Sequence, residues 1–174
     1  AQAQNEVNQG TKINGIGLKV LIADDASKPI QAQKIAEDLA GKRDILAVIG
    51  HLSSEVTLAA VPIYTQQQLV LISPGSTSVK LTAWGMKPDR FFFRTVPSDR
   101  FAGQALATYL HNQLEQQTAT ILYNPANNFS KSIREQFSIS FAASGGQVVK
   151  EFDLSKPEFN PANSIDQAQK QGST

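Results

Sequence analysis

Short apolar runs rich in branched residues alternate with helical segments along most of the chain, and this alternation limits the possible folds more than any other feature. The predicted strands cover residues 17–23, 45–49, 69–72, 120–123 and 147–152. The predicted helices cover residues 1–9, 29–40, 54–67, 99–114, 128–143 and 161–171. Strands of this kind are typical of buried parallel sheets, and the helices between them match right-handed βαβ connections. The sequence therefore predicts an α/β protein.

The ends of the predicted helices carry local signals. Ser27 is a candidate N-cap for the helix that starts near Pro29, in which Ile30, Ile35 and Leu39 form an apolar stripe. Either Ser53 or Ser54 can cap the helix that follows, because serine side chains accept hydrogen bonds from the first free amides.

The pattern of strands and helices restarts after Val96-Pro97, where proline stiffens the chain. We therefore predict two lobes, residues 1–96 and 97–174. The second lobe has two predicted strands, fewer than the three that a stable sheet usually needs, and the first helix starts at residue 1 without a cap. We expect the chain to be part of a larger protein at both ends.

Composition and motifs exclude several functions. Sixteen basic and fifteen acidic residues give a net charge of +1, which does not favour nucleic acid as a partner. Cysteine is absent, and the sequence contains no GxxxxGK[ST], GxSxG or HExxH motif. Gly15-Ile16-Gly17 precedes a predicted strand and lacks the third glycine of a dinucleotide site. We predict no catalytic residues, no metal and no cofactor.

Ligands of open parallel sheets bind at the carboxyl ends of the strands, which directs attention to three loops, residues 24–27, 50–54 and 73–77. The last two are rich in hydroxyl groups and glycine and lead into predicted helices. Free amides and the positive end of a helix dipole favour an anion such as a carboxylate at such places. The alternative is that Ser54 and Thr77 only cap their helices.

Asp24 and Asp25 end the first predicted strand and allow another interpretation, because receiver domains hold Mg²⁺ with such a pair. The next two strands end in Gly50-His51 and Ser73-Pro74, so no phosphoacceptor aspartate follows. We interpret the pair as a turn at the end of the strand. His51 has no carboxylate in its own loop to orient it, and we interpret His111, in the middle of a helix, as structural.

Four stretches of the sequence resemble one family. They are VIGHLSSEVTLAAVPIYTQQQLVLISPGSTSVKLT, ADDASKPIQA, FFFRTVPSDRFAG and ILYNPANNFSKSIREQF. In this order they are similar to segments of leucine/isoleucine/valine-binding proteins, which belong to the type I periplasmic-binding-protein family. The resemblance implies two Rossmann-like lobes with parallel sheets, the first lobe lacking its first strand and the second lobe partial.

The resemblance also implies a ligand site. Ser54 matches a serine that holds the α-carboxylate of an amino acid, Thr77 matches a threonine with a similar role, and Gly75 offers main-chain contacts. Ser53 and Ser76 belong to the same two loops, and Phe129 stands where many relatives have a tyrosine that packs on the ligand. Ser27 and Ser53 take the positions of two half-cystines, so that disulfide cannot form. The acidic partner of the ligand's ammonium group is expected beyond Thr174.

These features predict an extracytoplasmic, periplasmic solute-binding protein. It would capture a small carboxylate-bearing ligand, an amino acid or amide, and deliver it to the membrane permease of an ABC transporter. One alternative is the ligand-binding sensory domain of a membrane receptor or kinase. A remote alternative is a receiver-like phosphoacceptor or another α/β enzyme.

Overall fold

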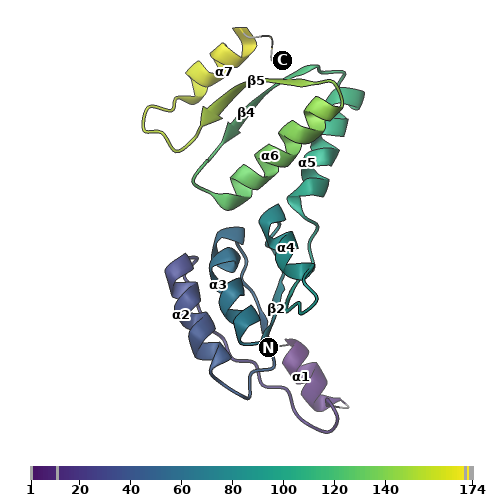
Figure 1. Ribbon diagram of the computed structural model, residues 1–174, viewed down its shortest axis with the longest axis vertical. Helices are drawn as coiled ribbons and strands as arrows, with labels where there is room; N and C mark the ends of the chain where they lie inside the picture. Colours follow the sequence, from purple (N-terminus) through teal and green to yellow (C-terminus); the bar gives the residue numbers. More distant parts are fainter. Residues whose placement is uncertain (1, 11, 171, 173–174) are drawn as a thin grey trace.

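The first of two parallel sheets follows the predicted βαβ pattern in a computed structural model that describes residues 2–10, 12–170 and 172 (Figure 1). Its strands lie in the order β1 (Ala47–Ile49), β2 (Val70–Ser73) and β3 (Phe92–Arg94). All pairs are parallel, with Ala47 opposite Val70 and Leu71 opposite Phe92. The α/β prediction is confirmed.

Helices α2 (Pro29–Ala40) and α3 (Ser54–Gln66) pack together beside this sheet and form the main core. Tyr64, Leu71 and Leu81 are fully buried in it. Small alanines on both helices, among them Ala36 and Ala60, allow the close packing because they are buried without filling much space. The core fixes the strand ends that carry the candidate loops.

The second sheet contains two parallel strands, β4 (Thr118–Tyr123) and β5 (Gln147–Asp153). Helix α5 (Asp99–Thr108) continues into a π-helical turn, η2 (Tyr109–Gln113), and packs against α6 (Asn128–Ala143). The core here is smaller and consists of Ala107, Ala119 and Phe141 with partly buried neighbours. Helix α7 (Pro161–Lys170) follows β5, and the part of the prediction at Gln171 lies outside the described residues.

Residues 95–98 connect β3 to α5, and therefore the first sheet to the helices of the second. The Asp99 amide donates to the Thr77 carbonyl at 2.8 Å, which ties the start of α5 to a candidate loop. The predicted lobe boundary at Val96-Pro97 lies in this connection, between two separate hydrophobic clusters. The division into lobes remains a prediction.

The prediction of a buried strand over residues 17–23 is wrong. The segment is not assigned as a strand, and Ile22 is 89% exposed. A cavity of about 560 Å³ is lined by this segment and by β1, and β1 pairs with β2 alone in the described part of the chain. The apolar sequence favours a buried strand, but a strand is buried only when another strand pairs with it. Among the described residues, no strand fills the cavity between residues 17–23 and β1.

Helix positions agree better with the sequence than this strand does. The predicted α6 is confirmed at both ends, and α1 (Gln2–Gln9) confirms the helix at the start for the described residues. Two details of α2 are wrong: Lys28 rather than Ser27 is its N-cap residue, and Ile30 is exposed. Ser27 has a positive φ of 53°, in a turn that directs the chain into the helix.

Candidate functional site

Helix α3 begins with two adjacent serines that have different roles. Ser53 is the N-cap, and its Oγ accepts a hydrogen bond from the Val56 amide at 3.4 Å. Ser54 is the first residue of the helix and is buried. Its Oγ accepts a hydrogen bond from the Ser78 amide at 3.1 Å. This bond joins the loop of residues 50–54, called the first loop from here on, to the end of the loop of residues 73–77, called the second loop. The interpretation of Ser54 as a simple cap is therefore wrong.

The second loop leads into a very short helix. Ser78 caps the 3₁₀ turn η1 (Val79–Leu81), since its Oγ accepts from the Lys80 amide at 3.4 Å. Thr77 is therefore not a cap either. Three residues of 3₁₀ helix, followed by the single turn α4 (Thr82–Gly85), do not sum to a large dipole, so the expectation of a strong helix-end field at this loop is wrong.

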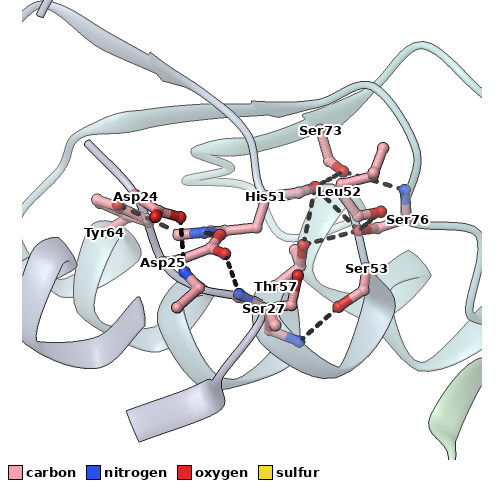
Figure 2. Close-up of polar contacts among 12 residues, drawn as sticks. Asp24, Asp25, Ser27, His51, Leu52, Ser53, Thr57, Tyr64, Ser73 and Ser76 are labelled. Carbon is pink, nitrogen blue, oxygen red and sulfur yellow. Dashed lines mark hydrogen bonds and ion pairs between the residues drawn. The ribbon is translucent and has the colours of Figure 1, made fainter. Parts of the chain in front are cut away.

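Buried hydroxyl groups hold the two loops together around one carbonyl oxygen (Figure 2). The His51 carbonyl accepts from Ser73 Oγ at 2.7 Å, Ser76 Oγ at 3.2 Å and Thr57 Oγ1 at 3.3 Å. Ser76 and Thr57 also share a hydrogen bond of 2.7 Å, and both are fully buried. The Ser76 hydroxyl is thus engaged inside the protein and fixes the spacing of the loops.

Gly75 lies against the first loop. A Cβ atom at this position would come within 2.6 Å of Leu52 Cδ1 and 2.8 Å of the Leu52 carbonyl oxygen. Any other residue would push the loops apart, because part of the obstacle is backbone. The glycine therefore permits the close approach of the two loops.

Arg94, at the end of β3, holds the second loop through hydrogen bonds from its guanidinium group, and the sequence did not predict this role. Its Nη1 donates to the carbonyls of Thr77 at 3.1 Å and Ser78 at 3.0 Å, and Nη2 donates to Thr82 Oγ1 at 2.8 Å. Burial lowers the pKa of Arg94, and the negative charge of Asp99 opposes this shift. An arginine at a strand end next to a candidate loop is the signal that could have identified it, because its planar fork can donate to several carbonyls at once.

The first turn of α6 reaches the first loop. Glu55, directly after Ser54, accepts hydrogen bonds from the main-chain amide of Asn128 at 3.2 Å and from its side-chain amide. Phe129 is the next residue of this turn, and its side chain is 51% exposed. The structure thus brings together the turns that carry Ser54 and Phe129, which are 75 positions apart in the sequence.

The loop of residues 24–27 forms a polar contact with the first loop, and the sequence did not predict this contact (Figure 2). His51 is 6% exposed, and its Nδ1 lies 2.6 Å from Asp25 Oδ2, so the orienting carboxylate comes from another loop. Burial raises the pKa of Asp25, but hydrogen bonds from His51 and the Ser27 amide outweigh it and leave the pKa below its usual value. Burial and the charge of Asp25 raise the pKa of Tyr64 to about 12.

The expected turn at the two aspartates is confirmed. Asp24 Oδ1 accepts from the Ala26 amide and Asp25 Oδ1 from the Ser27 amide, each at 2.8 Å. Among the described residues, no group of three or more histidine, cysteine, aspartate or glutamate side chains is arranged to hold a metal ion. His111 contacts Phe141 edge to ring, which agrees with a structural role.

The loops of residues 50–54 and 73–77 lie at the carboxyl ends of parallel strands, the place where α/β folds usually bind small molecules. The family model described as periplasmic binding protein matches residues 1–174, and the chain belongs to this family.

Several of the similar proteins are named for binding amino acids. An amino acid binding protein of Pseudomonas aeruginosa is 31% identical over 124 residues, which are 71% of this chain and 32% of that protein. The Leu/Ile/Val-binding protein of Escherichia coli is 32% identical over 123 residues, again 71% of this chain and 32% of the relative. An ABC transporter substrate-binding protein from Desulfitobacterium hafniense, solved in complex with Leu, superposes with a TM-score of 0.82 at 30% identity, over 99% of this chain and 50% of that one.

The chain therefore spans from about a third to a half of the length of these relatives. The resemblance noted from the sequence is confirmed, and so is the type of fold. Within the described residues, no helix combines the length and apolar character that crossing a membrane requires.

Proposed function

We propose that the chain forms part of a periplasmic solute-binding protein that captures an amino acid for an ABC transporter without changing it chemically. In this proposal residues 1–96 and 97–174 belong to two lobes. The ligand binds where the loops of residues 50–54 and 73–77 meet the first turn of α6. The names of the relatives support an amino-acid ligand, and the family is one of binding proteins rather than enzymes.

The observation that carries the proposal is that neither Ser54 nor Thr77 is the N-cap of a helix. Ser53 and Ser78 perform that role, so the two candidate side chains are not needed to complete the helix ends. They are nevertheless held close together, because Ser54 Oγ bonds to the amide of the residue after Thr77. Two hydroxyl groups and the free amides at the start of α3 form a suitable site for a carboxylate.

The remaining predicted residues have supporting roles in this proposal. Gly75 offers main-chain groups to the ligand, and its lack of a side chain lets the two loops approach each other at Leu52, while Ser53 and Ser76 fix the shape of the loops. Phe129 packs its ring on the ligand from the other side, through the contact between α6 and α3.

The test is isothermal titration calorimetry of the purified protein with the twenty common amino acids and their amides. We expect one class of amino acid to bind, and Ser54→Ala and Thr77→Ala each to weaken binding about tenfold, the effect of losing a hydrogen bond to a charged group. Ser140→Ala and Thr108→Ala are matched controls, since neither side chain lies in the loops. If no compound binds, or if the controls and the loop variants behave alike, the proposal is wrong.

The sensory-domain alternative uses the same ligand site and gives the same result in this assay. The receiver-like alternative gains no support, because the carboxylates of Asp24 and Asp25 already accept hydrogen bonds within their own turn and Asp25 is also bonded to His51.

A further inference from the structure

A small set of polar contacts joins the first turn of α6 to the elements around the first sheet. Glu55 of α3 accepts two hydrogen bonds from Asn128, and Lys80 Nζ donates to Asn128 Oδ1 at 3.4 Å. The Val79 amide donates to Ser132 Oγ at 3.1 Å. Figure 1 shows α6 with one end directed toward α3 and α4, across the gap between the two sheets.

These contacts lie immediately beside the proposed ligand groups. Glu55 follows Ser54 in the chain, and Asn128 precedes Phe129. Val79 follows Ser78, whose amide is bonded to Ser54. A movement of α6 away from α3 that breaks the contact between Glu55 and Asn128 would therefore also separate Ser54 from Phe129.

The position of the Glu55 carboxylate is electrostatically favourable in two ways. It lies in the first turn of its own helix, α3, and it also accepts from the first amide of α6. The positive ends of two helix dipoles thus act on one carboxylate. Asn127 completes this end of α6 as its N-cap, with Oδ1 accepting from the Ser130 amide at 2.9 Å.

The junction is also of a kind that can open. The hydrophobic clusters of the two sheets are separate, and the chain passes between them at residues 95–98. Glu55 and Asn128 are both only partly buried, so opening exchanges their hydrogen bonds for bonds to water at small net cost.

We propose that Glu55 and Asn128 form a latch that holds α6 against the ligand loops and so sets the balance between an open and a closed arrangement. The two residues are positioning residues, which act on the ligand through Ser54 and Phe129. Because a ligand that needs the closed arrangement binds in proportion to its population, loss of the latch weakens binding. The effect on binding depends on the function proposed above, while the effect on closure does not.

The absence of cysteine from all 174 residues makes a direct distance measurement possible. Glu37→Cys on α2 and Ile139→Cys on α6 are exposed positions for two spin labels, and pulsed electron paramagnetic resonance then reports the distance between them. We expect Glu55→Ala to shift the distribution toward longer distances, Glu55→Gln to lie between because it keeps an acceptor oxygen, and Glu135→Ala, elsewhere on α6, to leave it unchanged. A circular dichroism melt shows whether each variant is folded.

Two readouts separate the latch from the proposed function. If Glu55→Ala leaves the distance distribution unchanged while the variant is folded, the latch does not exist, whatever the ligand. If the distances shift and calorimetry gives an affinity about tenfold weaker for the bound amino acid, about 1.4 kcal/mol, both parts of the inference stand. If the distances shift but the affinity of a bound amino acid is unchanged, Glu55 does not position the ligand site, and that part is overturned.

Discussion

Replacing Gly103 by alanine should destabilise the protein, although the same change stabilises most helices. In a solvent-exposed helix, alanine is favoured over glycine by about 1 kcal/mol. Gly103 lies in α5 where it crosses α6, and a Cβ atom there would be 2.7 Å from the backbone C and the Cβ of Gln136 and from the Phe137 nitrogen. Because the obstacle is mainly backbone, no change of rotamer can relieve the overlap.

The cost follows from this geometry. Overfilling a packed interface costs about 1–3 kcal/mol, and contact with backbone places Gly103→Ala near the upper limit. After subtraction of the gain in helix propensity, we expect the free energy of unfolding to fall by about 2 kcal/mol. For a chain of this size, that corresponds to a decrease in Tm of about 4–8 °C.

Urea unfolding followed by far-ultraviolet circular dichroism measures this change. Gly85→Ala is the matched control, because a Cβ atom there would meet the Phe92 carbonyl oxygen at an ordinary 3.4 Å. Gly85→Ala should be neutral or slightly stabilising. If Gly103→Ala is as stable as the original chain, α5 and α6 are not packed as closely as the structure shows, and the reasoning is refuted.

Three further predictions concern the polar groups around the loops. Arg94→Lys should lower the free energy of unfolding by about 1–3 kcal/mol in urea titrations, since a single ammonium group cannot replace the fork that bonds three carbonyls and a hydroxyl; an unchanged midpoint would contradict this role. Because the pKa of Asp25 is lowered, its ionised carboxylate stabilises the folded protein fully at pH values above the usual pKa of 3.8, and this stability is lost as the pH falls through the lowered pKa. The melting temperature of Asp25→Asn should therefore depend less on pH in this window than that of the original chain. Tyr64, with its pKa raised to about 12, should contribute stability that is complete below pH 10 and is lost as the pH rises through 12; in an ultraviolet titration Tyr64→Phe should lack one phenol that ionises near pH 12, and a step of unchanged size would disprove the assignment.

The sequence predicted those parts of the fold that depend on local chemistry. Helix α6 has an asparagine cap at one end and a glycine pair at the other, and both boundaries were predicted correctly. Residues 17–23 have the composition of a buried strand, yet whether they are buried depends on a neighbour that local sequence does not specify. The choice between Ser53 and Ser54 as the cap depended on backbone conformation, which serine residues do not reveal.

The candidate site was predicted to a similar extent. Both hydroxyl-rich loops were identified, because strand ends are the usual place for ligands in parallel sheets. The residues that hold the loops were not identified, since their partners are distant in sequence: Arg94 is 17 positions from Thr77, and His51 is 26 positions from Asp25. Contacts of this kind are set by the sheet order and become visible only in the folded structure.

Among the residues that the structure describes, β1 pairs with β2 alone, and its other edge has a consequence for handling the chain in solution. Residues of β1 line the cavity beside residues 17–23, and among them Ile49 is 80% exposed. An open edge with apolar neighbours is a template on which further chains can pair, so self-association should increase with concentration and compete with refolding. Lys19 and Asp44 line the same cavity, and charged side chains beside a strand edge reduce its pairing with other chains, because the pairing would desolvate them. Replacing either of them by alanine should therefore increase self-association.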